Sequence, residues 1–189
     1  MNDAGSAAAP SIKGMGIIML VKALRHRRQE ARELLPARLH DYLDRRVLPS
    51  SWYPEADYAG LLRATGRLYG YSRPEHFQDL GAAQARHDLE QVYRVMVRLG
   101  DPVATLERLE GLWRLYHDSG RLRVALEGDA QAAVIIEDYP LARPDVCGVT
   151  GGFVAEALSL AGAVDVKLAK LRCRLTGHDH CRWQLRWSD

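Results

Sequence analysis

The sequence predicts an α+β fold in which N-terminal helices pack on an antiparallel sheet of about four strands. Up to Gly120, apolar residues recur at helical spacing, whereas later segments carry the alternation and the β-forming residues typical of strands. The late order is strand, strand, helix, strand, strand, so that one helix lies between two C-terminal hairpins. An antiparallel sheet packed under helices accommodates this order best.

Length and composition indicate one globular domain. The chain has 189 residues, 47% of them hydrophobic and 26% charged, which suffices for a sizeable core. Residues 1–11 are small and polar and are expected to form a disordered tail, which leaves residues 12–189 as a single ligand-binding-type domain. A net charge of +2 is too small to indicate nucleic acid, and the basic segment Lys22 to Arg46 is interpreted as a solvated helix face.

The chain lacks the features of export or membrane insertion. Its N-terminus does not have the charged-then-apolar order of a signal peptide, and the apolar segment Gly14 to Leu24 is too short to span a bilayer. We therefore expect a cytoplasmic protein without a membrane span. Because the cytosol keeps thiols reduced, the three cysteines indicate metal ligation or burial rather than a disulfide framework.

Helices are predicted where apolar residues follow a helical period. These residues are Leu35, Leu39, Tyr42 and Leu43, then Tyr58, Leu61, Leu62 and Leu68, and then Leu89, Val92, Tyr93, Met96 and Leu99. A turn is expected over Pro49 to Pro54. A further helix should begin at Asp101-Pro102, where a capping side chain precedes a proline at the first helical position, and should end by Gly120.

Two hairpins are expected after Gly120. Strands over Arg121 to Leu126 and Ala132 to Ile136 are joined through Glu-Gly-Asp-Ala. Helical spacing returns over Asp145 to Ala161, and Gly162 is a stop signal. The second hairpin combines β-forming residues from Val164 to Leu175 with the alternating Trp183 to Trp187, and it turns near Gly177.

The second hairpin should bring Cys173 and Cys181 roughly opposite each other, while Cys147 stands near the start of the preceding helix. Thiolates suit zinc, and three of them need one further ligand. His180 or His178, at the tip of the hairpin, could supply it. The alternative is that the cysteines are small buried hydrophobic residues. Spacing alone leaves both interpretations open.

The C-terminal segment resembles a known family. The run Cys147-Gly-Val-Thr-Gly-Gly-Phe, the strand that begins Val164-Asp-Val-Lys, and the Cys-x3-Gly-x3-Cys hairpin that starts at Cys173 are similar to the 4-vinyl reductase-type ligand-binding domain. That domain also forms the sensory part of phenol-responsive transcription activators. The resemblance implies that the three cysteines ligate zinc.

One position departs from that family. Its zinc sites usually have a glutamate ligand where this chain has Lys170, which cannot ligate while protonated. The fourth ligand would then be His180, His178, Asp179 or water, or the site would be empty. With the resemblance, our hypothesis is a structural zinc on Cys147, Cys173 and Cys181, with His180 as the fourth ligand.

The N-terminal half supports a wider resemblance. Lys13-Gly-Met-Gly, the segment Ser51 to Tyr58, and Gly100-Asp-Pro-Val are similar to a family of uncharacterised myxobacterial proteins of comparable length. Both groups are similar in architecture to haem nitric-oxide-binding domains and to Bet3-type subunits of the TRAPP tethering complex. This implies the fold more directly than it implies a function.

Helices laid over a sheet leave room for an apolar pocket between the layers. Trp113, Tyr116 and His117 lie together near the end of the Asp101 helix, and Tyr139 is expected to come near them. The alternative is that these aromatic residues are ordinary core. With the resemblance, they imply a sensing module for a small hydrophobic or aromatic ligand, acting in trans. The other function class is a TRAPP Bet3-like scaffold subunit without a small ligand.

Three further expectations complete the interpretation. Haem on His117 is not expected, because the Tyr-x-Ser-x-Arg clamp of haem nitric-oxide-binding domains is missing and the segment Tyr69 to Arg73 has the wrong spacing. The chain has no Gly-x-Ser-x-Gly, no phosphate-binding glycine loop and no Cys-x-x-Cys, so it is not expected to be an enzyme. The apolar stretch Ile17 to Val21, together with the family resemblance, predicts a homodimer.

Overall fold

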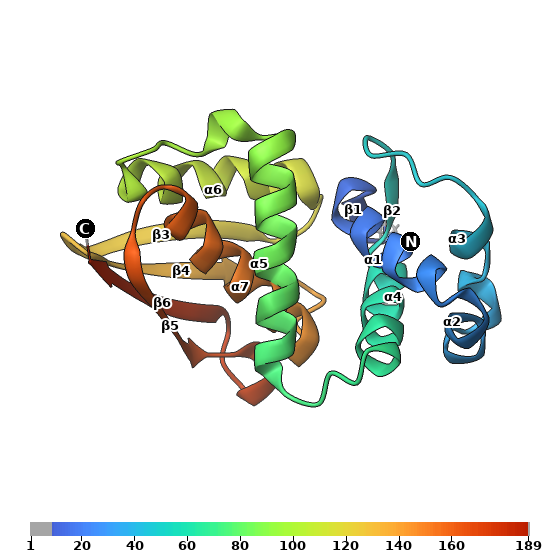
Figure 1. The fold of residues 1–189 in the computed structure, drawn as a ribbon. Coiled ribbons are helices and arrows are strands. Elements are labelled where there is room, and N and C mark those ends of the chain that lie inside the picture. Colours follow the sequence, from blue (N-terminus) through green and yellow to red (C-terminus); the bar gives the residue numbers. More distant parts are fainter. Residues whose placement is uncertain (1–8, 189) are drawn as a thin grey trace, which may run out of the picture.

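The computed structural model describes residues 9–188, and these residues form two neighbouring parts (Figure 1). The first part contains the N-terminal helices with a small two-stranded sheet. The second contains a four-stranded sheet and three long helices. Residues 1–8, which make up most of the predicted tail, lie outside the described residues.

The first part is mainly helical. Its elements are β1 (Ser11–Lys13), α1 (Met15–His26), α2 (Arg28–Leu34), the 3₁₀-helix η1 (Ala37–Leu39), α3 (Asp41–Asp44), β2 (Trp52–Pro54) and α4 (Glu55–Leu68). Strands β1 and β2 are antiparallel, with Ile12 opposite Tyr53. The predicted turn over Pro49 to Pro54 is therefore wrong at its C-terminal end, because its last three residues pair with β1.

The apolar stretch on α1 lies inside the molecule. Ile17, Leu20 and Val21 are all buried, and α1 packs on α4. The stretch is thus part of the core of a single chain, which removes the sequence-based reason to expect that it packs against a second copy.

Two predicted helices are interrupted. After Leu35, which has extended backbone angles, Pro36 separates α2 from η1, since a residue before proline disfavours the helical region. The helix predicted through Leu99 ends at Gln91, and a separate 3₁₀-helix follows. Leu99 is 82% exposed, so its apolar spacing does not reflect a buried face.

The second part contains the main sheet. Its elements are α5 (Pro74–Gln91), the 3₁₀-helix η2 (Arg94–Met96), α6 (Pro102–Tyr116), β3 (Arg121–Gly128), β4 (Gln131–Glu137), α7 (Pro144–Leu160), β5 (Val164–Arg172), the 3₁₀-helix η3 (Arg174–Thr176) and β6 (Cys181–Ser188). The strand order is β3-β4-β6-β5, and every pairing is antiparallel. The predicted α+β class, with one helix between two C-terminal hairpins, is confirmed.

The sheet has a buried face and a polar face. Along β6, Trp183 and Leu185 are buried. Arg182 and Gln184, which alternate with them, lie on the other face and hydrogen-bond to Glu127. Helix α6 packs on β3 and α7 packs on β5, so these helices and the buried face form the core of this part.

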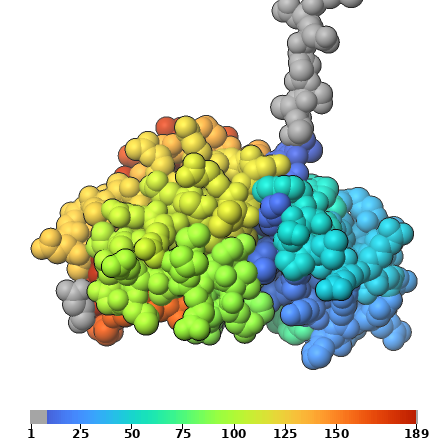
Figure 2. All heavy atoms as spheres, turned by 90° about the horizontal axis from the view of Figure 1, so that it is seen from above, coloured from blue at the N-terminus to red at the C-terminus, as the bar shows by residue number. Residues whose placement is uncertain are grey.

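Two glycines let α5 approach α7 closely. A Cβ atom on Gly81 would lie 2.0 Å from the carbonyl oxygen of Val149, and one on Gly152 would lie 1.9 Å from that of Gln78. Only glycine fits at these positions, so backbone packs directly on backbone. The view from above shows the first part packed against the side of the second that carries α5 and α6 (Figure 2). No helix within residues 9–188 is both long and apolar enough to cross a bilayer.

Candidate functional site

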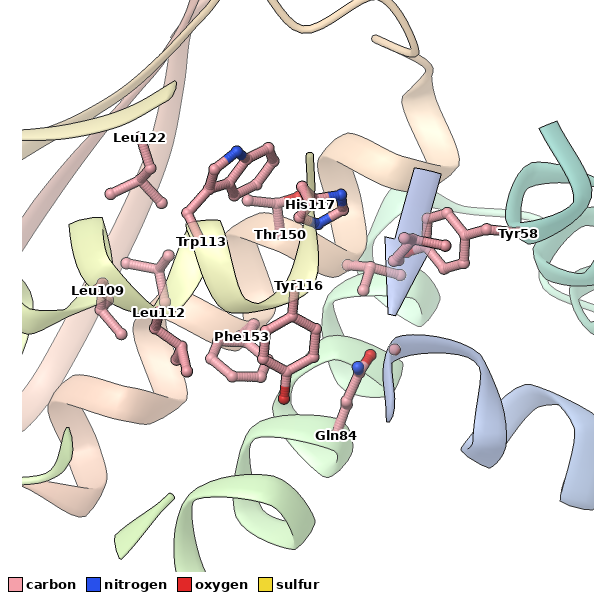
Figure 3. Close-up of a pocket in the computed structure, with 14 residues that line it drawn as sticks. Tyr58, Gln84, Leu109, Leu112, Trp113, Tyr116, His117, Leu122, Thr150 and Phe153 are labelled. Atoms are coloured by element: carbon pink, nitrogen blue, oxygen red, sulfur yellow. The ribbon is translucent and has the colours of Figure 1, made fainter. Parts of the chain in front are cut away.

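An apolar pocket lies where the two parts meet, between β1, α4, α5, α6 and α7 (Figure 3). The cavity has a volume of about 70 Å³ and is partly open. The lining residues are Ile12, Gly16, Tyr58, Gln84, Leu109, Leu112, Trp113, Tyr116, His117, Leu122, Val149, Thr150, Phe153 and Val154. Most of them are aliphatic or aromatic, with a few polar groups, which is typical of a site for a small apolar ligand.

Three of the four predicted pocket residues line this cavity. Trp113, Tyr116 and His117 come from the last turn of α6 and the residue after it. The rings of Trp113 and His117 are stacked, with centroids 4.1 Å apart. Tyr139 does not line the cavity. It lies behind it, edge-on to Trp113 at 5.1 Å and to His117 at 5.4 Å.

His117 is fixed by a carboxyl group from the first part. Its Nδ1 atom lies 2.8 Å from Oε1 of Glu55, which is fully buried and also accepts a hydrogen bond from the Ser119 hydroxyl at 3.3 Å. Among residues 9–188, no hydrogen bond engages Nε2 of His117. That nitrogen is therefore the one left to meet a ligand.

Glu55 is a site residue that sequence reasoning missed. It is the first residue of α4, and the N-terminus of a helix favours a carboxylate. No local pattern links it to His117, because the two are 62 positions apart. Its Oε2 atom and the hydroxyl of Tyr139 are the two buried polar side-chain atoms without a hydrogen bond in the described chain. Burial and the nearby Glu55 raise the pKa of Tyr139 well above its ordinary value.

A second buried carboxyl group, that of Asp88, binds two residues that line the pocket. Asp88 on α5 accepts a hydrogen bond from the Tyr116 hydroxyl and one from Gln84, and it contacts Nδ1 of His87 at 2.9 Å. Burial, together with this carboxylate, raises the pKa of Tyr116. The hydroxyl group of Tyr116 thus has a hydrogen-bond partner, whereas the hydroxyl group of Tyr139 has none among the described residues.

The three cysteines form a cluster at the edge of the sheet. Cys147 lies in the first turn of α7, Cys173 follows β5, and Cys181 begins β6. Their sulfur atoms all lie within 4.8 Å of one another, and both Cys147 and Cys173 are 4.0 Å from Cys181. A tetrahedral zinc with Zn–S bonds of about 2.3 Å requires sulfur atoms about 3.8 Å apart. The three thiols therefore fit a zinc ion after small movements.

The fourth ligand is not in place. Among residues 9–188, no histidine or carboxylate joins the three-sulfur group. Nδ1 of His180 contacts Asp179 at 2.6 Å, and Nδ1 of His178 is bound to the Thr176 hydroxyl and to the carbonyl of Cys173. The proposed fourth ligand, His180, would have to leave Asp179 or to use its other ring nitrogen.

The cluster favours a thiolate at Cys181. The hydrogen bond between Cys147 and Cys181 lowers the pKa of the Cys181 thiol to about 5 and raises that of Cys147. The ammonium group of Lys170 acts in the same direction on Cys181.

Comparison with known proteins shows similarity at the level of fold. No family model matches the sequence, and no curated protein matches it. Solved structures of H-NOX proteins do match across 94% of this chain, so the chain has an H-NOX-like fold. This is the architecture that the resemblance to haem nitric-oxide-binding domains implied.

Three of these structures give the scale of the similarity. An H-NOX protein from S. oneidensis in the Fe(II)NO ligation state is 15% identical, with 99% of its chain covered and a TM-score of 0.67. An oxygen-binding H-NOX domain related to soluble guanylate cyclases is 12% identical, with 95% covered and a TM-score of 0.68. A variant of the T. tengcongensis H-NOX is 11% identical, with 98% covered and a TM-score of 0.69.

The pocket of this chain does not fit a haem. Its cavity of about 70 Å³ is far below the roughly 300–1,000 Å³ of sites for drug-sized ligands, and a porphyrin is at least that large. We therefore propose no function that depends on haem.

Proposed function

We propose that this protein is a ligand-sensing module whose pocket binds a small, mostly apolar molecule with one hydrogen-bonding atom. The observation that carries the proposal is the apolar cavity lined by Trp113 and His117. The lining of the cavity supplies the hydrophobic contacts to the ligand, and Nε2 of His117 supplies a hydrogen bond. Glu55 holds the imidazole ring in place from behind.

The size of the cavity bounds the ligand. An engineered apolar cavity of about 150 Å³ holds benzene, whereas this one encloses about 70 Å³. A molecule of a few heavy atoms fits the observed arrangement. A larger aromatic ligand requires the side chain of Phe153 or Tyr116 to move, because both line the cavity.

The second element of the proposal is a structural metal ion. A thiophilic ion such as zinc on Cys147, Cys173 and Cys181 would fasten the start of α7 to the hairpin of β5 and β6. The spacing of the three sulfur atoms supports this role. When bound, the ion would cross-link the two elements rather than supply chemistry, as metal ions in structural sites do.

The experiment that tests the pocket is a fluorescence titration with propan-2-ol, a molecule of four heavy atoms that include one hydroxyl oxygen. Binding should change the tryptophan emission of the native protein. The change should disappear in Trp113→Leu and persist in Trp52→Leu, because Trp52 is 45% exposed and lies outside the pocket. Loss of the response in both variants, or in neither, contradicts the proposal.

Self-association remains a prediction of the family resemblance alone, since Ile17 to Val21 lie inside the chain. Light scattering at micromolar concentration should show a mass of twice 21.2 kDa if a homodimer forms. A mass of 21.2 kDa would contradict the dimer without affecting the pocket.

A further inference from the structure

Lys170 stands beside the cysteine cluster on the edge strand β5. In the register of β5 and β6 it lies directly opposite Trp183, which follows Cys181 by two residues on the same face of β6. Its Nζ atom lies 4.3 Å from the centroid of the Trp183 ring. The side chain of Lys170, an exposed residue, therefore extends over the face of the sheet that carries Trp183 and Cys181.

The ammonium group lies on the face of the sheet that carries Cys181. Its Nζ atom lies over the ring of Trp183, two residues after Cys181 on that face. A lysine side chain ordinarily carries a positive charge at neutral pH. An ammonium group has three donors and no lone pair, so it can pair with thiolates and cannot ligate a metal ion.

This cation changes what the site can hold. Zinc in structural sites is almost always four-coordinate, and here its fourth ligand would have to enter beside a positive charge. An ion that binds stably to three sulfur ligands does not need a fourth ligand at that position. For a divalent ion the charges also balance, because three thiolates and one ammonium group offset the two charges of the metal.

We propose that Lys170 restricts the cluster to three sulfur ligands, so that the site prefers a thiophilic divalent ion that accepts three thiolates over zinc. The inference rests on the proposed metal site and goes beyond it by naming the residue that sets its selectivity. Binding joins the ion to three sulfur atoms. Each thiol that is still protonated releases its proton to solvent when its sulfur binds the ion.

The test uses Pb(II) as the three-sulfur ion and Zn(II) as the four-coordinate ion, on the full chain. Binding is read from the sulfur-to-lead charge-transfer absorption and from competition between the two ions. The variants are Lys170→Glu, which offers a carboxylate ligand, and Lys170→Gln, which only removes the charge. Lys167→Glu is the matched control, because Lys167 is on the same strand but on the opposite face.

The wild type should bind one equivalent of Pb(II) and hold it against Zn(II). Lys170→Glu should raise the zinc affinity by about tenfold or more, Lys170→Gln should raise it less, and Lys167→Glu should leave it unchanged. If the zinc affinities of all four proteins agree within about twofold, Lys170 does not set the selectivity, although the metal site itself is still supported. A tenfold difference corresponds to about 1.4 kcal/mol. Absence of binding in every protein, or lead absorption that survives Cys173→Ser, overturns the metal site and the inference together.

Discussion

The Nδ1 atom of His117 lies 2.8 Å from the Oε1 atom of Glu55, whose side chain is fully buried. This contact joins the end of α6 to the start of α4, and so it connects the two parts of the molecule at the edge of the pocket. The backbone supports it, because Ile12 pairs with His117 and the amide of Asp118 donates to the carbonyl of Ser11. A group that fills the pocket therefore touches a residue that ties both parts together.

Removing the imidazole ring of His117 should lower the stability of the folded chain. His117→Ala leaves the carboxyl group of Glu55 buried with one weak partner, so the free energy of unfolding should fall by about 3 kcal/mol. Glu55→Gln keeps an acceptor for His117 and should lose about 1 kcal/mol. Urea unfolding measures both. Equal losses in the two variants would show that the contact between the two side chains is not what stabilises this region.

Two tyrosines next to the pocket should respond in opposite ways to loss of the hydroxyl group. Tyr116→Phe removes a buried hydrogen bond to Asp88 and should cost about 1–3 kcal/mol. The Tyr139 hydroxyl has no partner among the described residues, so Tyr139→Phe should be neutral or slightly stabilising. Thermal melts of the two variants make the comparison, and a large loss in Tyr139→Phe would place an unseen partner on that hydroxyl.

The same tyrosines predict alkaline unfolding. Burial raises the pKa values of Tyr58, Tyr116 and Tyr139, whereas in the unfolded chain they ionise near pH 10. Ionisation therefore favours the unfolded state, and stability should be constant below about pH 10 and should fall as the pH rises further. Urea midpoints across this range measure the slope, which should be smaller in Tyr139→Phe. A midpoint that does not change above pH 10 would contradict the burial of these hydroxyls.

Removal of metal should lower the melting temperature in the same step. A metal ion at about 100 times its dissociation constant stabilises the folded chain by about 2.7 kcal/mol. Chelator should remove that stabilisation from the wild type but not from Cys173→Ser or Cys181→Ser, which should already melt lower. His180→Ala tests only the fourth position and should change less. Elemental analysis that finds well below one equivalent of metal in chelator-free wild type would leave the cysteines as buried thiols.

Much of the fold could be predicted because it rests on local patterns. The alternation of β6 and the cap at Asp101, whose side chain accepts from the amide of Ala104 at 2.8 Å, are visible in the sequence. The errors arose where a tertiary contact replaced local spacing. Strand β2 exists because β1 is present to pair with it, and the helix expected through Leu99 stops early although its apolar spacing continues.

The site could be predicted only in part for the same reason. Trp113, Tyr116 and His117 are neighbours in the sequence, so their proximity needs only a helix. Glu55 reaches His117 through the packing of α4 against the rest of the chain, which no spacing reveals. Tyr139 lies next to Trp113 as expected but does not line the cavity, because strand order does not specify depth.

The most direct test of the central claim is to identify, by mass spectrometry, what an organic extract of the freshly purified protein contains. Leu109→Trp fills the pocket, and Leu115→Trp makes the same change on the same helix at a residue that is 41% exposed and outside the lining. Both variants are first shown to be folded. The account predicts one small molecule, close to one equivalent, in the wild type and in Leu115→Trp, and none in Leu109→Trp. The same extract from all three proteins would contradict it.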